Sequence, residues 1–383
     1  MNLILWDPSP EIFTLGPLSV RYYGLMFAVS FLVSQQIMLH IFRKEGKPEE
    51  DMDDLTIYMI LATVLGARLG HVLFYDFDKY FYNFKTGEVG DLLGVFKIWE
   101  GGLASHGATF GILFAIWLYT KYKIKLFPPK ATPVVRKGQS FLWVVDRLVL
   151  VAAISGVFIR FGNFMNSEIV GKPGDVPQAT VFGRWAEDYV QNAFSDVATA
   201  EIGAPDKDFA VEEGHAPVMM TVRFAGNIGA ERATTDARNI LVNLASDRVY
   251  SHEFIRVGRP GEGTELYTVG SDADGLYAKL YLEGIPRHPT QLYESFTCLL
   301  IFFILFFIWK RYKENLPPGL TFGLFLVLLF GLRFVHEFFK ENQVAFEDDI
   351  ALNMGQWLSI PLVLVGLVIF ARALRHKPKA TQE

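Results

Sequence analysis

The stretch FLWVVDRLVLVAAISGVFIRFGN, residues 141–163, is apolar over most of its length but carries Arg160 near its end. A membrane-spanning helix needs about 20 predominantly apolar residues, and this stretch supplies them. An ionisable side chain inside such a helix is costly, so it usually faces a bundle interior or a wet cavity. The stretch therefore predicts a membrane helix that takes part in a functional site.

Segments of similar length and composition recur along the chain, at residues 20–42, 55–76, 102–121, 291–309, 318–339 and 355–374. The 383 residues are 51% hydrophobic and 15% aromatic, and only 20% are charged. Together with the long apolar runs, these values are typical of an integral membrane protein. We expect an all-α polytopic membrane protein with a bundle of about seven transmembrane helices.

Basic residues are concentrated in alternate connections between these segments, at positions 43–47, 121–137, 310–313 and 372–379. The positive-inside rule makes all four regions cytoplasmic. The N-terminus is then extracytoplasmic and the C-terminus cytoplasmic, which fits an odd number of spans. Residues 1–18 contain no lysine or arginine and no small-residue cleavage site, so we expect no cleavable signal.

Residues 172–286 break the pattern because they are polar and contain no run long enough to span a membrane. Residues 218–224 alternate like a β-strand, and residues 231–244 have the period of an amphipathic helix. Weaker strand signals follow at 253–257 and 265–269. We expect a small α+β insertion on the extracytoplasmic side.

The chain is thus divided into three parts. Residues 1–171 hold an N-terminal extracytoplasmic segment and four transmembrane helices. Residues 172–286 form the insertion, and residues 287–383 hold three helices and a cytoplasmic tail. The net charge of -5 gives no indication of a nucleic-acid partner, and the one cysteine, Cys298, cannot form a disulfide framework. Cys298 lies in an apolar run, where we expect an inert, packed thiol.

Histidine and glycine meet where the third span begins. His106 can exchange a proton near neutral pH, and Gly102, Gly107 and Gly111 allow close approach of a helix or a ligand. The alternative is a packing histidine that is hydrogen-bonded to a neighbouring helix.

The fourth span ends in Arg160, Asn163, Glu168 and Gly171. Arg160 and Asn163 share a helix face at i, i+3, and Glu168 follows where we expect the helix to break. Arginine is the preferred bidentate partner of phosphate. The alternative is an Arg160–Glu168 pair that only closes the helix end.

A second arginine, Arg333, lies late in the sixth span, one turn before Glu337. The two can form a self-neutralised helical pair. Alternatively, Arg333 joins Arg160 in a clamp for a phosphodiester headgroup. Other polar residues have simpler interpretations, since Glu294 can complement the dipole of the fifth span, and Tyr23 and Arg68 can be interfacial or packing residues.

Seven blocks, in this order, resemble the prolipoprotein diacylglyceryl transferase family of bacterial inner membranes: RYYGLMF (21–27), GARLGHVLFY (66–75), GGLASHGATFG (101–111), RFGNFMNSEIVGK (160–172), RHPTQLYES (287–295), LRFVHEFFKE (332–341) and MGQWLSIP (354–361). The chain departs from the family where Ser167 replaces a glycine and where position 329 is leucine, so we leave position 329 out of the site. The insertion is also longer than the family leads us to expect.

The resemblance implies that the diacylglyceryl group of phosphatidylglycerol is transferred to the lipobox cysteine of a prolipoprotein, with formation of a thioether and release of glycerol phosphate. It implies a membrane enzyme that needs no metal and no soluble cofactor. Its partners would be phosphatidylglycerol, signal peptides with a lipobox cysteine, and membrane lipid. The implied catalytic residues are His106, Arg160, Arg333, Glu168, Glu337 and Tyr23, and the implied lipid-binding residues are Arg160, Asn163, Arg333, Gly171 and Gly102.

The thiol must lose its proton because the thiolate is the nucleophile. His106 is the first candidate for the base, and Glu168 or Glu337 are alternatives. Two other classes of function compete with a transferase. A transporter predicts inverted repeats and discontinuous spans, and no internal repeat is visible. A non-enzymatic assembly factor predicts that function depends on residues 172–286 and not on Arg160.

Overall fold

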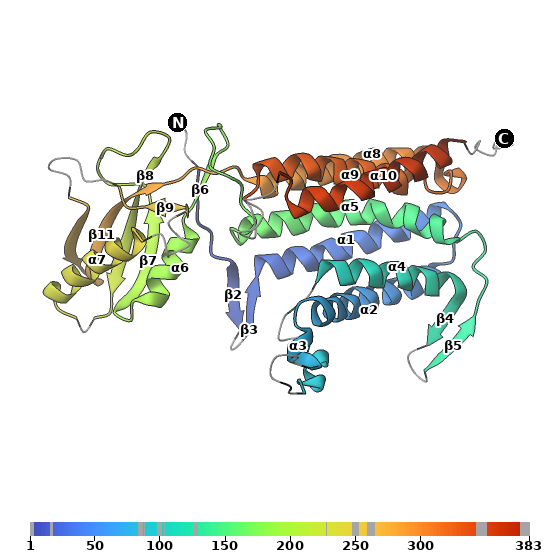
Figure 1. Ribbon diagram of the computed structural model, residues 1–383, viewed down its shortest axis with the longest axis horizontal. Helices are drawn as coiled ribbons and strands as arrows, with labels where there is room; N and C mark the ends of the chain where they lie inside the picture. The colour runs from blue at the N-terminus through green and yellow to red at the C-terminus, as the bar shows by residue number, and fades with distance from the viewer. Residues whose placement is uncertain are drawn as a thin grey trace. The chain divides into compact units, whose positions relative to one another are not determined.

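The computed structural model describes residues 4–15, 18–82, 87, 89–97, 102, 104–125, 129–226, 228–246, 253–258, 265–341 and 351–375. Within these residues, six helices are long and apolar enough to cross a membrane: α1 (Tyr22–Lys44), α2 (Glu49–Phe74), α5 (Phe141–Met165), α8 (Thr290–Tyr312) with its extension to Asn315, α9 (Leu320–His336) with its extension to Phe339, and α10 (Met354–Arg375) (Figure 1). The chain is therefore a multi-pass membrane protein.

The segment expected at 102–121 forms a shorter helix, α4 (Ser105–Lys121). At 1.5 Å per residue its 17 residues cover about 25 Å, slightly less than the hydrocarbon core of a bilayer. The other expected spans differ from the observed helices by a few residues at each end. Apolar content thus locates the helices well, while their ends depend on local capping and turns.

The chain divides into two compact units. The first comprises Met1–Val29, Gly156–Cys298 and Leu332–Ser359, and the second comprises Ser30–Ser155, Leu299–Gly331 and Ile360–Glu383. Each unit collects segments that are far apart in the sequence. The division cuts through α1, α5, α8, α9 and α10, so each unit contains one end of these helices.

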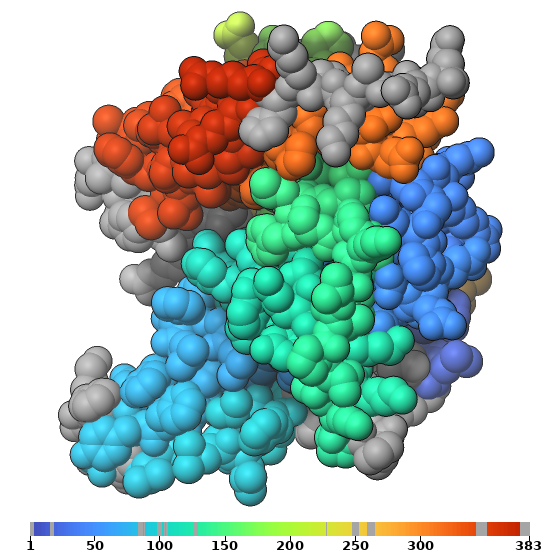
Figure 2. Space-filling view, turned by 90° about the vertical axis from the view of Figure 1, so that its right-hand side faces the viewer, coloured from blue at the N-terminus to red at the C-terminus, as the bar shows by residue number. Residues whose placement is uncertain are grey.

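In the second unit, α2 and α4 pack through glycines. A Cβ added to Gly66 would lie 2.6 Å from the carbonyl oxygen of Gly107, and one added to Gly111 would lie 2.7 Å from that of Ala62. Small residues at a helix interface let the backbones approach this closely. The other side of α4 carries exposed Phe110, Phe114 and Trp117, and Figure 2 shows α4, in teal, at the surface.

Charged groups inside the second unit are paired. Glu45, at the end of α1, accepts hydrogen bonds from Trp143 Nε1 at 2.8 Å, Arg147 Nη2 at 2.9 Å and Trp309 Nε1 at 2.6 Å. Asp146 accepts from the backbone N–H of Gly319 at 2.6 Å, where α9 begins. These charges join helices to one another, so a charge inside a span is not by itself evidence of a reaction site.

The polar insertion contains a five-stranded antiparallel sheet in the order β10–β11–β8–β7, with β9 beside β11. Its strands are β7 (Val197–Gly203), β8 (Ala216–Phe224), β9 (Ile255–Arg256), β10 (Tyr267–Asp272) and β11 (Gly275–Gly284). Alternate residues of β8 are buried against α6 (Arg184–Ala193) and α7 (Ala230–Leu244). The strand expected at 218–224 thus lies within β8, and the helix expected at 231–244 coincides with α7.

Shorter elements complete the chain: β1 (Ile4–Trp6), β2 (Glu11–Leu15), β3 (Leu18–Arg21), α3 (Phe77–Tyr80), η1 (Leu92–Phe96), β4 (Tyr122–Lys125), β5 (Lys130–Pro133) and β6 (Thr180–Phe182). Strand β1 pairs in parallel with β6, which fixes the N-terminal segment to the start of the insertion. Trp6 strengthens this attachment by donating a 2.9 Å hydrogen bond from Nε1 to the carbonyl oxygen of Phe164.

Candidate active site

The end of α5 carries Arg160, one of the two arginines predicted to bind a phosphodiester. Helix α5 ends at Met165, and the chain then turns through Ser167 and Ile169, which have positive φ angles of 54° and 56°. Non-glycine residues adopt this left-handed conformation rarely and at an energetic cost. The turn ends the helix two residues after Asn163 and carries Glu168 away from the helix axis.

Glu168 does not pair with Arg160. Its carboxylate accepts hydrogen bonds from Asn163 Nδ2 at 3.3 Å and from Asn166 Nδ2 at 3.2 Å. The alternative prediction, an Arg160–Glu168 ion pair that closes the helix end, is therefore wrong. The turn after Met165 directs the Glu168 carboxylate to the side-chain amides instead. Glu168 remains exposed in the first unit.

Arg160 is instead bound by a helix from another part of the sequence. Its Nε lies 2.8 Å from Oε2 of Glu294, in the second turn of α8. The other oxygen of Glu294 lies 2.6 Å from Nζ of Lys340. In addition to its predicted place near the start of α8, Glu294 therefore bridges two cations.

Lys340 connects Glu294 to the carboxylate that contacts the second arginine. Its Nζ also lies 3.2 Å from Oε1 of Glu337, and the same oxygen lies 3.5 Å from Nη2 of Arg333. Asn353 Nδ2 donates a 3.1 Å hydrogen bond to the other oxygen of Glu337. The result is one chain of alternating charges, Arg160–Glu294–Lys340–Glu337–Arg333, which we call the ionic chain.

Exposure varies along the ionic chain. The side chains of Glu294, Lys340 and Glu337 are 7%, 3% and 9% exposed, whereas those of Arg160 and Arg333 are 22% and 41% exposed. Three cations and two carboxylates leave a net charge of +1 when all are ionised. The positive charge is accessible at the two guanidinium ends, where one monoanionic phosphodiester would complete the charge balance.

Tyr23 packs beside the same end of α5. A Cβ added to Gly162 would lie 3.1 Å from Tyr23 Cδ2, so glycine at this position lets α1 approach α5. Seven of the predicted residues belong to the first unit: Tyr23, Arg160, Asn163, Glu168, Gly171, Arg333 and Glu337.

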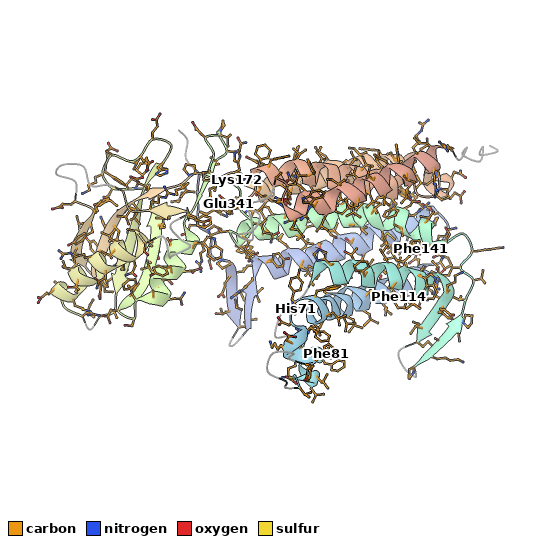
Figure 3. All side chains as sticks on the ribbon, viewed as in Figure 1. His71, Phe81, Phe114, Phe141, Lys172 and Glu341 are labelled. Atoms are coloured by element: carbon orange, nitrogen blue, oxygen red, sulfur yellow. The ribbon has the colours of Figure 1, made fainter. Side chains whose placement is uncertain are left out.

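Gly171 has a packing role beside the ionic chain. Its N–H donates to the carbonyl oxygen of His288 at 2.9 Å, and its own carbonyl accepts from Arg287 Nη1 at 3.1 Å. A Cβ here would lie 2.6 Å from the His288 oxygen. The next residue, Lys172, donates its N–H to the carbonyl oxygen of Phe339, so this loop lies beside the segment after α9, where Figure 3 labels Lys172 and Glu341.

His106 and Gly102 belong to the second unit. His106 is exposed in the first turn of α4. Gly102 has a φ of +70°, and a Cβ there would lie 2.5 Å from the ring of His71. Arg68 is 3% exposed and donates to the carbonyl oxygens of Gly94 at 2.6 Å and Val95 at 2.9 Å, which is a structural role.

Lys340 was not singled out from the sequence, and Glu294 was predicted only to complement a helix dipole. Both lie inside blocks that carry the family resemblance, and both are charged residues near an apolar segment. That signal was available, but the pattern of one helix cannot show a partner on another helix.

Comparison with known proteins shows the family to which the chain belongs. A family model described as prolipoprotein diacylglyceryl transferase matches residues 10–372. The chain is 30% identical to a relative from Tolumonas auensis over 98% of this chain and 100% of the relative. It is 31% identical to a relative from Chloroherpeton thalassium, over 98% of this chain and 96% of the relative. It is 29% identical to a relative from Bacteroides fragilis, over 96% of this chain and 95% of the relative. All three are named phosphatidylglycerol–prolipoprotein diacylglyceryl transferase. With its apolar helices and its match over nearly the whole length, the chain belongs to the prolipoprotein diacylglyceryl transferase family.

Proposed function

We propose that this chain transfers the diacylglyceryl group of phosphatidylglycerol to the lipobox cysteine of a prolipoprotein, and that the ionic chain binds the lipid phosphate. The sulfur forms a bond to the terminal glyceryl carbon of the diacylglyceryl group, and the bond from that carbon to the phosphate oxygen breaks. Glycerol phosphate leaves with the electron pair, and the thiol proton passes to a base. The product is a thioether.

The observation that carries the proposal is the placement of two arginines at the ends of one ionic chain. The substrate phosphodiester has one negative charge, and the departing phosphomonoester gains a second. Groups that stabilise charge as it develops in the transition state accelerate the reaction. Arg160 contacts Glu294 through Nε, and its terminal nitrogens would bind a phosphate oxygen.

The two carboxylates of the ionic chain hold the two guanidinium groups in position. Glu294 orients Arg160, and Glu337 orients Arg333, each within ion-pair distance. Lys340 contacts both carboxylates and adds the third positive charge, which offsets their repulsion of the phosphate. Pre-organised charges of this kind need little rearrangement during the reaction. Glu294 and Lys340 are thus proposed as positioning residues.

The remaining predicted residues receive proposed roles in the same reaction. His106 acts as the base that deprotonates the thiol or as the group that organises the base, with Glu168 or Glu337 as the alternatives. Tyr23 and Asn163 lie next to Arg160 or Glu168 and would orient the headgroup. Gly171 and Gly102 contribute through close backbone approach rather than through a side chain.

We also propose the topology that the sequence indicates. Helix α4 is a seventh span, residues 172–286 form an extracytoplasmic α+β insertion, and residues 1–171 and 287–383 supply the helices on either side. The N-terminus is extracytoplasmic and the C-terminus cytoplasmic, in a bacterial inner membrane. Support comes from the basic residues in alternate connections.

Transfer by the purified full-length protein tests the proposal. Labelled phosphatidylglycerol and a lipobox peptide are incubated with the protein, and mass spectrometry follows the diacylglyceryl mass on the peptide. Arg160→Lys and Arg333→Lys retain the charge but lose the planar fork, so each is expected to reduce the rate at least about tenfold. Arg311→Lys, at the other end of α8, is the matched control. Wild-type rates in both variants would exclude the arginine clamp, and absence of a thioether with folded wild-type protein would exclude the transfer.

A further inference from the structure

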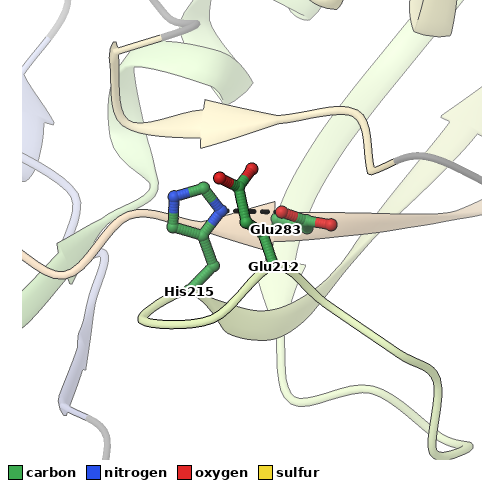
Figure 4. A group of neighbouring side chains, drawn as sticks. All are labelled: Glu212, His215 and Glu283. Atoms are coloured by element: carbon green, nitrogen blue, oxygen red, sulfur yellow. Dashed lines mark hydrogen bonds and ion pairs between the residues drawn. The ribbon is translucent and has the colours of Figure 1, made fainter.

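Three side chains with metal-binding atoms meet in the insertion, apart from the ionic chain. They are Glu212, in the connection before β8, His215, one residue before β8, and Glu283, on β11. One donor atom from each lies within 4.8 Å of the other two. Figure 4 shows the three side chains directed toward a common region from the loop and the sheet.

The register of the sheet accounts for this convergence. Strand β11 pairs antiparallel with β8 so that Glu283 is opposite Pro217, two residues beyond His215. His215 Nδ1 consequently lies 2.7 Å from Glu283 Oε2. Gly258 makes room for the carboxylate, since a Cβ at that position would lie 2.5 Å from Glu283 Oε1.

The burial of Glu283 within this cluster favours the binding of a cation. Glu283 is 5% exposed, and it contacts the imidazole of His215, which is charged only when protonated. Glu212 adds a second carboxylate from an exposed turn, so two carboxylates and one imidazole offer ligand atoms to the same point. A buried carboxylate needs compensation by a proton, an ion pair or a metal ion.

We propose that Glu212, His215 and Glu283 bind one divalent transition-metal ion of the zinc class. An imidazole nitrogen with carboxylate oxygens suits zinc and its neighbours, whereas magnesium and calcium prefer oxygen ligands alone. Three protein ligands leave a coordination position for water or for a further ligand. The ion fastens the turn at Glu212 to β11 and gives the insertion a metal-dependent stability. This site is separate from the residues proposed for transfer.

Direct metal titration tests the proposal. Tag-free full-length protein in detergent is dialysed against a chelator and then titrated calorimetrically with zinc chloride in a non-coordinating buffer. We expect one ion per chain, little competition from magnesium, and at least about tenfold weaker binding in Glu212→Gln and in His215→Gln. Glu213→Gln, a neighbouring exposed carboxylate outside the cluster, is the matched control and should bind as the wild type does.

Thermal unfolding distinguishes loss of the metal site from misfolding of a variant. Without metal, Glu212→Gln should unfold at the wild-type temperature because its side chain is exposed. Zinc should raise the unfolding temperature of the wild type and of Glu213→Gln, but not that of Glu212→Gln. Absence of stoichiometric binding by the wild type, or wild-type affinity in both ligand variants, would overturn the proposal.

Discussion

Lys340 Nζ lies 2.6 Å from Glu294 Oε1, and this contact connects the carboxylate that holds Arg160 to the segment that holds Arg333. Lys340 follows the last turn after α9, whereas Glu294 lies near the start of α8. Both side chains are almost fully buried. A buried charge without a partner is strongly destabilising, so each of the two depends on the other.

Replacing Lys340 by methionine tests this dependence. Methionine has a similar length but no charge, so Glu294 and Glu337 would repel one another and the phosphate. We expect transfer to fall at least about tenfold and the protein to lose about 3–5 kcal/mol of stability, the typical cost of breaking a buried pair. Turnover of labelled lipid and thermal unfolding in detergent measure the two effects. Lys310→Met, exposed at the end of α8, should change neither.

A double variant separates coupling from general damage. If Lys340 acts through Glu294, the stability losses of Glu294→Gln and Lys340→Met should overlap in the combined variant. The combined loss should then be smaller than the sum by about 0.5–3 kcal/mol. Losses that simply add would show that the contact carries no coupling energy.

The contrast between the two arginines shows how far the sequence could predict the site. Arg333 and Glu337 are one turn apart on a helix, and their 3.5 Å contact follows from helical periodicity. The partner of Arg160 could not be predicted in this way, because Glu294 belongs to another helix and the turn after Met165 diverts Glu168. Interhelical contacts depend on packing, which a local pattern does not specify.

The membrane helices were easier to predict because apolar length alone locates them. Helix α5 was expected at 141–163 and ends at Met165. The contacts of the glycines around His106 could not be predicted in this way, since the sequence left open whether they approach a helix or a ligand. Gly107 and Gly111 face backbone atoms of α2, whereas Gly102 faces the side chains of His71 and Arg68 on the same helix.

Substitution of Gly107 by alanine should separate α2 from α4. Its added methyl group would overlap the carbonyl oxygen of Gly66, a backbone atom that cannot move aside alone. Overpacking of this kind costs about 1–3 kcal/mol, so we expect a lower unfolding temperature. Gly331→Ala is the matched control. A Cβ there meets no heavy atom within 4 Å, and alanine is favoured over glycine in a helix by about 0.5–1 kcal/mol. Equal effects of the two substitutions would exclude the proposed close packing.

A carboxyl pair in the first unit should make stability depend on pH. Burial and the neighbouring Asp7 raise the pKa of Glu187 to about 9, and burial also raises the pKa of Asp7. The folded chain therefore binds more protons than the unfolded chain between the ordinary carboxyl pKa and about pH 9. Stability consequently falls as the pH rises through this window.

Glu187→Gln removes one titrating group while its amide oxygen can still accept the hydrogen bond from the N–H of Ile202. We expect the unfolding temperature of the wild type to decrease from pH 5.5 to pH 8.5, and that of Glu187→Gln to decrease less. Thermal unfolding monitored by circular dichroism at several pH values provides the measurement. Asp274→Asn, an exposed carboxylate in the insertion, should retain the wild-type slope. Parallel curves for Glu187→Gln and the wild type would contradict the assignment.

Replacement of His106 by glutamine tests its proposed role as the base. Glutamine retains hydrogen bonding but cannot accept the proton of the thiol, so we expect transfer to a cysteine peptide to fall about 10²–10⁴-fold. A selenocysteine peptide removes the need for a base, because a selenol is already ionised at neutral pH. If His106 only deprotonates the nucleophile, the variant should regain most of its activity with the selenocysteine peptide. His40→Gln, in α1 beside Trp309, controls for the loss of a histidine. A variant that remains equally impaired with both peptides would assign His106 to binding or packing, and wild-type activity with the cysteine peptide would remove it from the reaction.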